Sequence, residues 1–144
     1  RAALALIARA EQTRLGLKGK LERKGIDAAC VRAALNYLEE LGIVSDKRFA
    51  ELWLNSKLCR VKAGQGGKLC PRKLLGSLLG RSIPADIARK ALGAALDSGT
   101  ERALLDSYIA GTFPDFDGTD ASVRQRLREA GFSSAAIRAW REEL

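Results

Sequence analysis

The stretch Leu17-Lys-Gly-Lys-Leu-Glu-Arg-Lys-Gly-Ile26 decides the fold of this protein, because its plan occurs three times in the chain. Together with the segment 27–35 that follows, it predicts a helix, a glycine turn and a second helix with an Asp cap. The same pattern returns at 74–92 and at 123–140. In the aligned copies, apolar residues coincide at Leu17, Leu74 and Val123, at Leu21, Leu78 and Leu127, and at Ile26, Ile83 and Phe132.

Each copy has room for a third helix, because positions 26, 83 and 132 are separated by 57 and 49 residues. We expect these additional helices at about 2–10, 46–59 and 101–110. Val, Ile, Thr, Tyr, Phe and Trp do not alternate with polar residues over a useful length, so no strand is expected. The predicted fold class is therefore all-α.

The expected architecture is a row of tandem three-helix repeats, that is, three modules forming an elongated, curved helical array. The modules would occupy residues 1–44, 45–97 and 98–144, with a basic, glycine-rich connector at 60–70 in the second. Units of this size rarely bury their apolar faces alone, so neighbouring modules should pack against one another. Function would then depend on the surface rather than on a central pocket.

Helical spacing also predicts which side chains form the core. Phe49, Trp53, Leu54 and Leu38 could serve as binding anchors, since aromatic residues are common in interface hot spots. A small helical module needs such side chains for its own core first, and we interpret them in that way. Cys30 aligns with apolar positions in the other two copies, so it is interpreted as a packing residue.

Positive charge is concentrated in the first half of the chain, although the net charge of the whole protein is only +8. Residues 1–75 contain 16 Lys or Arg against 7 Asp or Glu, whereas residues 76–144 contain 9 against 10. No acidic residue lies between Glu51 and Asp86. Such a field attracts nucleic acid or an acidic protein face, although a solvated loop between helices would have the same composition.

The glycine-rich connector does not match a nucleotide-binding loop. A P-loop requires Gly-x-x-x-x-Gly-Lys followed by Ser or Thr. Here Lys62 stands in place of the first glycine, and Leu69 follows Gly67-Lys68. We interpret the connector as a flexible link to a helix that starts at Pro71, because proline suits the first helical turn.

Metal and catalytic sites are not expected. With three cysteines and no histidine, the chain lacks a close set of four zinc ligands and the commonest general base. Asp115, Asp117 and Asp120 do not complete a calcium loop, because the glycine comes too early and the closing glutamate is missing. Asp120 or Ser122 is instead expected to cap a helix. We predict no catalytic, cofactor-binding or metal-binding residue, and we do not expect an enzyme.

Composition also bears on location. No apolar run approaches the roughly 20 residues that cross a bilayer, so no membrane association is expected. An odd number of cysteines does not suit a disulfide framework, which favours a reducing, cytoplasmic location. Residues 1–14 have the pattern of an amphipathic helix rather than a signal peptide. We expect the protein to be a monomer.

The segment Glu40-Leu-Gly-Ile-Val-Ser-Asp-Lys-Arg-Phe-Ala-Glu-Leu-Trp-Leu-Asn-Ser-Lys57 resembles the central signature of the RecX family of recombinase regulators. In that signature a glycine-hydrophobic turn leads into Asp-x-Arg-Phe-Ala and a basic helix end. Pro71–Ile83 resembles the segment that follows it in the family, and Leu17–Ile26 resembles the first-module motif. The resemblance covers about residues 4–95, and the third repeat matches in pattern only.

The resemblance implies a bacterial modulator of the RecA recombinase, with a role in homologous recombination, DNA repair and the SOS response. Family members lodge in the helical groove of the RecA–DNA filament and bridge neighbouring protomers. They restrain the ATPase, strand-exchange and coprotease activities of the filament. The expected function is therefore to bind this filament and to modulate those activities in the direction of inhibition.

We hypothesise that the basic face of the first two modules makes the contact with RecA and with DNA, single- or double-stranded, directly or within the filament. The candidate partner-binding residues are Lys18, Lys20, Arg23, Lys24, Arg48, Lys57, Arg60, Lys62, Lys68, Arg72 and Lys73. The alternative is a stand-alone basic helical DNA-binding protein, whose affinity comes from phosphate contacts. A third interpretation is a helical adaptor for another acidic protein.

Overall fold

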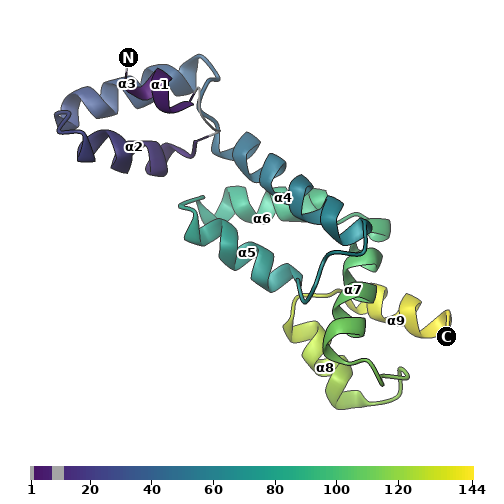
Figure 1. Ribbon diagram of the computed structural model, residues 1–144. Coiled ribbons are helices and arrows are strands. Elements are labelled where there is room, and N and C mark those ends of the chain that lie inside the picture. The colour runs from purple at the N-terminus through teal and green to yellow at the C-terminus, as the bar shows by residue number, and fades with distance from the viewer. Residues whose placement is uncertain (1, 8–11) are drawn as a thin grey trace.

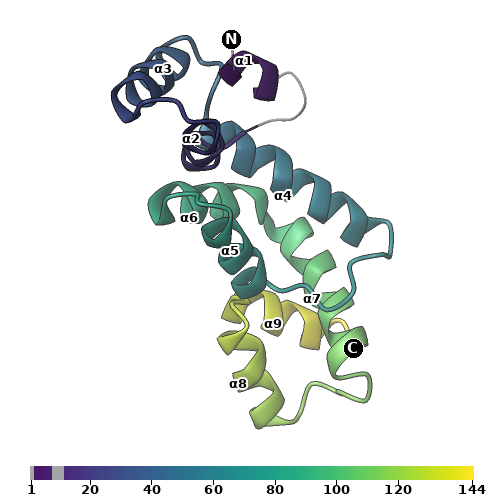
Figure 2. The ribbon, with the colours of Figure 1, turned by 60° about the vertical axis from the view of Figure 1, so that its left-hand side comes forward.

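The computed structural model describes residues 2–7 and 12–144, and this part of the chain contains nine α-helices and no strand. The helices follow one another along the molecule, which is elongated, with α1 and α9 at opposite ends (Figure 1, Figure 2). The predicted all-α fold class is therefore confirmed. The helices are α1 (Ala2–Ile7), α2 (Arg14–Arg23), α3 (Ala28–Glu40), α4 (Asp46–Lys62), α5 (Pro71–Gly80), α6 (Ala85–Ala95), α7 (Ser98–Thr112), α8 (Ala121–Glu129) and α9 (Ser134–Glu142).

The three additional helices lie where the spacing predicted them, with different bounds. Helix α4 runs to Lys62, beyond the expected end at 59. Helix α7 begins at Ser98, earlier than expected, because the side chain of Asp97 accepts a hydrogen bond from the Thr100 N–H at 2.8 Å and caps the helix there. Helix α1 covers Ala2–Ile7, and residues 8–10 of the predicted first helix lie outside the described residues.

The same turn precedes α3, α6 and α9. The N–H of the apolar anchor bonds the carbonyl five residues earlier, which is the outer bond of a Schellman motif. These bonds join Ile26 to Leu21 at 3.4 Å, Ile83 to Leu78 at 3.2 Å and Phe132 to Leu127 at 3.2 Å. The residue before each anchor has a positive φ: Gly25 (81°), Ser82 (66°) and Gly131 (103°). The repeat in the sequence thus corresponds to a repeated turn, with a serine in a glycine conformation in the second copy.

The buried side chains form two hydrophobic clusters. The first lies within residues 3–44 and includes Leu17, Leu21 and Leu35, each at most 2% exposed. The second continues from Ala50 of α4 to Ile137 of α9. Helices α4–α9 therefore share one core, and the three domain boundaries stay a prediction.

Most of the predicted core residues are in the core. Leu38 and Leu54 are buried, and Phe49 and Trp53 are half-buried and pack against the second cluster. Their interpretation as core residues is confirmed. Cys30 is exposed, so its interpretation as a packing residue is wrong. The buried face of α3 begins at the next residue, Val31, because the side chains of successive helical residues point in different directions.

A glycine allows the α8–α9 turn to touch the start of α5. Gly131 has a φ of 103°, and a Cβ atom placed on it would lie 2.9 Å from the Cβ of Pro71. This close approach lets the Arg72 N–H donate to the carbonyl of Ala130 at 2.9 Å. The last two helices are therefore attached to the second module by backbone contact as well as by apolar packing.

The glycine-rich connector packs against its neighbours instead of forming a flexible link. Gly66 is buried, and a Cβ atom on it would lie 2.6 Å from Val61 Cγ2 and 3.0 Å from Ser107 Oγ. The hydroxyl of Ser107 donates to the carbonyl of Gly67 at 3.2 Å. The expectation of a flexible link is corrected by these contacts, which place the connector between α4 and α7.

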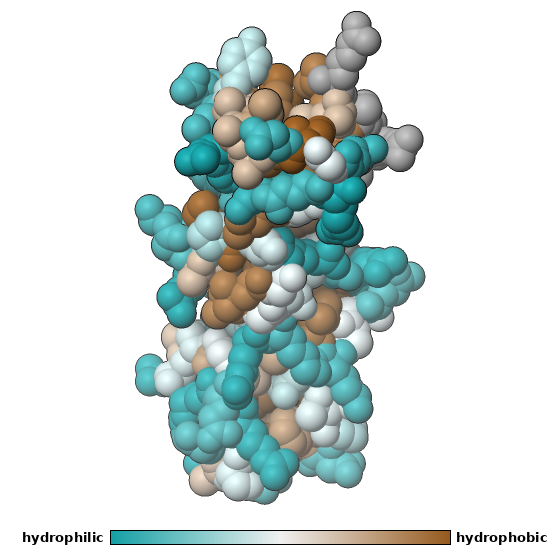
Figure 3. All heavy atoms as spheres, turned by 90° about the vertical axis from the view of Figure 1, so that its left-hand side faces the viewer, coloured by the Kyte–Doolittle hydropathy of each residue, from teal (hydrophilic) through white to brown (hydrophobic). Residues whose placement is uncertain are grey.

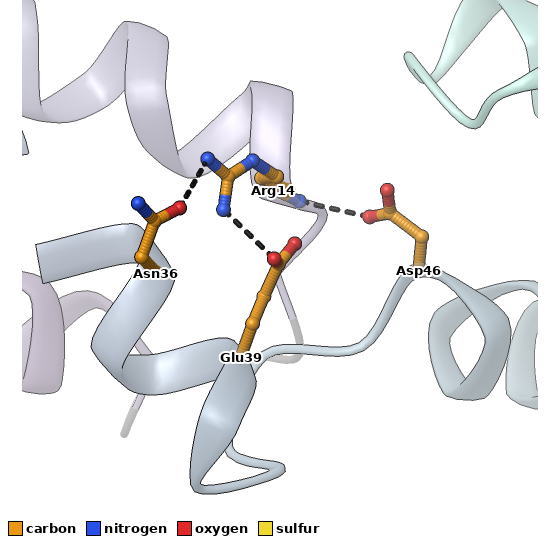
Figure 4. A network of polar contacts seen from close by, with 4 residues as sticks. All are labelled: Arg14, Asn36, Glu39 and Asp46. Carbon is orange, nitrogen blue, oxygen red and sulfur yellow. Dashed lines mark hydrogen bonds and ion pairs between the residues drawn. The ribbon is translucent and has the colours of Figure 1, made fainter. Parts of the chain in front are cut away.

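Arg14 connects the first hydrophobic cluster to α4. Its backbone N–H donates to Asp46 Oδ1 at 2.9 Å, and its guanidinium donates to Asn36 Oδ1 at 2.9 Å (Figure 4). The Nη1 atom also lies 2.9 Å from Glu39 Oε2. We call these four residues the Arg14 clasp. Because the two hydrophobic clusters are separate, polar contacts of this kind help to set the position of α1–α3 on α4.

Candidate partner-binding surface

Four candidate residues lie on α2 and at its C-terminal end, and we call them the α2 basic group: Lys18, Lys20, Arg23 and Lys24. All four are exposed. Lys20 Nζ donates to Gln12 Oε1 at 2.8 Å, and Lys18 Nζ lies 3.8 Å from Glu22 Oε1. The ion pair of Lys18 is exposed and therefore weak, and Lys20 itself is exposed, so both cations stay accessible to a partner.

A second group of cations surrounds Trp53 on α4. Lys57 Nζ lies 5.6 Å from the centroid of the indole ring, and Arg81 Cζ lies 5.4 Å from it. Both distances fit cation–π contacts. Sequence reasoning selected Lys57 but missed Arg81, although Arg81 lies in the same acid-free stretch of the chain. The structure brings the two cations onto one half-buried ring.

Arg48 makes two hydrogen bonds to the backbone of the turn between α3 and α4. Its guanidinium donates to the carbonyls of Gly42 and Ile43, both at 2.7 Å. These bonds close the turn between α3 and α4. A partner would have to compete with these two hydrogen bonds. The geometry therefore gives Arg48 a structural role in the turn between α3 and α4, and its role in partner binding stays a prediction.

The last turn of α4 carries two further candidates, Arg60 and Lys62, both exposed. The positive charge of Lys62 reaches the N-terminal cap of α7. The pKa of Asp97 is lowered, chiefly by the hydrogen bond from the Thr100 N–H and to a smaller extent by Lys62. Lys62 therefore stabilises the ionised cap and is also accessible to solvent.

The remaining candidates lie beside a cavity of about 670 Å³ between α5, α7 and α8, which we call the α5–α8 groove. Its lining includes Arg72, Lys73, Tyr108, Phe113 and Arg126. Arg126 was not a candidate, because it lies far along the chain in a half with balanced charge. The charge pattern that identified Arg72 and Lys73 gives no signal for Arg126.

Lys68 belongs to the same neighbourhood through its backbone, whose carbonyl accepts from Lys73 Nζ at 3.2 Å. The structure thus brings Lys68, Arg72 and Lys73 close together. The α2 basic group lies on a helix of the other hydrophobic cluster. The candidates form separate groups along the molecule rather than one continuous patch.

The described surface is mixed in character. Figure 3 shows hydrophobic residues reaching the surface in the upper and middle parts of one face, while hydrophilic residues cover most of the lower part. Exposed apolar side chains include Leu15, Leu52 and Leu79. Interfaces between proteins commonly combine such apolar contacts with a polar rim.

Within residues 2–7 and 12–144, no helix has the length and apolar character needed to cross a membrane. In the same part of the chain, His, Cys, Asp and Glu side chains do not gather in threes as a metal site requires. Cys30 and Cys59 are exposed free thiols, and Cys70 is a buried one.

The fold and surface define a class, the elongated all-α proteins with exposed cationic groups. No family model matches the chain. It is 30% identical over 141 residues to the regulatory protein RecX of Syntrophotalea carbinolica, an alignment that covers 94% of this chain and 88% of that protein. It is 35% identical over 150 aligned residues to the regulatory protein RecX of Thermobifida fusca, covering 98% and 76%. The chain belongs to the RecX family of regulatory proteins, which confirms the resemblance.

The fold is also found in a solved structure. The crystal structure of RecX from Lactobacillus salivarius matches with a TM-score of 0.72, covering 99% of this chain and 92% of that one. The two sequences are 22% identical in this comparison, so the match shows a shared fold.

Proposed function

We propose that this protein binds the RecA–DNA filament and modulates its ATPase, strand-exchange and coprotease activities in the direction of inhibition. Family membership supports the regulatory role. The observation that supports the contact surface is the set of exposed cations on α2 and around the end of α4 and the start of α5. Such cations are attracted to the phosphates and acidic faces of a nucleoprotein filament.

The elongated arrangement supports binding at more than one point. The α2 basic group and the cations near α5 lie on elements of different hydrophobic clusters. When both engage one filament, the second contact is intramolecular, so two weak sites give strong overall binding. We further propose that the protein acts as a cytoplasmic monomer with three modules at 1–44, 45–97 and 98–144, and that it is not an enzyme.

The test is the ATPase rate of a RecA filament on single-stranded DNA, titrated with this protein. We expect the rate to fall at substoichiometric protein. The variant K24E/R60E/K68E reverses three exposed candidates and should lose this effect, with its helicity unchanged by circular dichroism. The matched control R89E/K90E/R128E reverses three exposed residues outside the candidate set and should inhibit as the wild type does.

A wild-type protein without effect on the filament would reject the proposal. If it still bound duplex DNA in a salt-sensitive way, the stand-alone DNA-binding function would replace it. If K24E/R60E/K68E inhibited as well as the control variant, the regulatory role would stand but the assigned surface would be wrong.

A further inference from the structure

We propose that the α5–α8 groove binds single-stranded nucleic acid, with phosphates held by its cations and a base stacked against its aromatic side chains. This inference rests on the proposed function and deepens it, because Arg72 and Lys73 belong to the surface proposed for the filament. It adds Tyr108 from α7, Phe113 from the residue that follows α7, and Arg126 from α8.

The charges of the groove favour a phosphate ligand. Arg72 and Lys73 from the first turn of α5 and Arg126 from α8 line the same cavity. The single carboxylate in the lining is Glu129, whose Oε1 accepts from Gln125 Nε2 at 3.4 Å. Three cations against one anion leave the groove positive. Arginine and lysine are the residues that most often contact phosphate oxygens.

The aromatic side of the groove is held in position by neighbouring rings. Tyr108 contacts Phe132 with ring centroids 5.4 Å apart, and it meets Phe113 edge-on at 6.2 Å. Burial raises the pKa of Tyr108, so its phenol stays neutral in ordinary buffers. Tyr108 and Phe113 are half-buried, and each leaves part of its surface in the groove. Aromatic rings beside cations are the usual platform for bases of single strands.

The groove is also preformed. The contact of Gly131 with Pro71 and the hydrogen bond from the Arg72 N–H to Ala130 fix the start of α5 against the α8–α9 turn. Its volume of about 670 Å³ lies within the range of roughly 300–1,000 Å³ typical of ligand sites. A preformed site loses less conformational entropy when it binds.

The combination favours a single strand over two other ligands. Bases in a duplex are stacked on each other and present only their edges, whereas a single strand can turn a base toward a ring. An acidic peptide would satisfy the cations but would leave Tyr108 and Phe113 without a stacking partner. Only the single strand uses both halves of the groove.

The test measures binding of a fluorescent 20-nucleotide oligothymidine to the full chain by anisotropy, without recombinase. R72Q/R126Q removes two groove cations, and R89Q/R128Q removes the same charge from exposed positions that do not line the groove. We expect at least tenfold weaker binding for R72Q/R126Q only. The slope of log affinity against log salt should fall in magnitude by about 1.4, since each lost phosphate contact accounts for about 0.7 with single strands.

A second measurement follows the base. Oligothymidine that contains 4-thiothymidine should crosslink under ultraviolet light to the peptide with Tyr108 and Phe113. Equal affinity of the two double variants, or a crosslink confined to other peptides, would overturn the assignment. Tighter competition by a DNA duplex or by a polyglutamate peptide than by unlabelled oligothymidine would also overturn it.

The RecA ATPase assay on the same variants separates this inference from the proposed function. If the oligonucleotide results depend on the groove but the wild type leaves the filament unaffected, the groove assignment stands and the filament function fails. If the wild type inhibits the filament but oligonucleotide binding does not depend on the groove, only the groove assignment fails.

Discussion

Helices α1–α3 and helices α4–α9 are built from the same helix-turn-helix plan, yet they bury their apolar side chains differently. The first three helices enclose a cluster of their own, whereas the next six share one continuous cluster. The Schellman turn recurs in both regions. A repeated local structure therefore does not determine how neighbouring copies assemble.

The contacts between copies account for the difference. The second and third copies meet through Gly131 and Pro71, where backbones approach closely, and their buried apolar side chains belong to one cluster. The first copy meets α4 through the polar Arg14 clasp. Close backbone approach and apolar packing extend a core, but a few polar contacts do not.

The largest expected effects come from truncating one leucine in each cluster. Leu54 and Leu21 are at most 2% exposed, and replacing such a leucine with alanine costs about 3 kcal/mol. We expect L54A to increase hydrogen exchange throughout α4–α9, and L21A to increase it in α1–α3 alone. Exchange followed by mass spectrometry measures both. Equal loss of protection over the whole chain in either variant would show that the two clusters unfold as one.

The next comparison uses the same turn position in the two regions. G131A places a Cβ atom 2.9 Å from Pro71 and holds alanine at a φ of 103°, so we expect a loss of about 3 kcal/mol in unfolding free energy. G25A has the backbone strain but meets nothing within 4 Å, so about 1 kcal/mol is expected. Urea denaturation gives both values. Similar losses would show that strain alone matters.

Breaking the Arg14 clasp should change orientation more than stability. D46A removes the acceptor of the Arg14 N–H, and we expect a loss of about 1 kcal/mol. Spin labels on the exposed thiols Cys30 of α3 and Cys59 of α4 should give a broader distance distribution in this variant. D27A is the matched control, because the Asp27 side chain makes no capping bond. An unchanged distribution in D46A would show that the clasp does not set the orientation.

The smallest effect is a gain. Ser82 has a φ of 66°, a conformation that costs a non-glycine residue about 1 kcal/mol. Glycine relieves this strain but makes the unfolded chain more flexible, so S82G should stabilise the protein by about 0.5 kcal/mol. S82A retains the strain and should give no gain. Thermal unfolding distinguishes the two, and a lower melting temperature for S82G would contradict the expectation.

The sequence predicts most local features, but the Asp cap expected at the start of α3 is wrong, because the Asp27 side chain makes no capping bond. The helix pairs, the turns before Ile26, Ile83 and Phe132, and the start of α5 at Pro71 are all present. These features depend on residues a few positions apart, which the pattern contains. Asp120 also caps α8 as expected, accepting from the N–H groups of Ser122 and Val123.

Long-range contacts are the part that the sequence does not predict. Nothing near Arg72 indicates that its N–H bonds Ala130, or that Arg126 lines the same groove. Arg48 lies in the same basic half of the sequence as the other candidates, although its guanidinium donates hydrogen bonds to two backbone carbonyls. Charge patterns identify the basic region, but they cannot tell a side chain that is free to bind a partner from one that holds a turn within the protein.

The separate clusters also have a consequence for how the chain folds during synthesis. The contacts of the first cluster lie within residues 3–44, so α1–α3 can fold as soon as they leave the ribosome. The second cluster cannot be completed until Phe132 and Ile137 have been made. Helix α4 packs mainly against α6 and α7, so its apolar face stays open until these two helices have been made. During that interval the nascent chain is most exposed to aggregation.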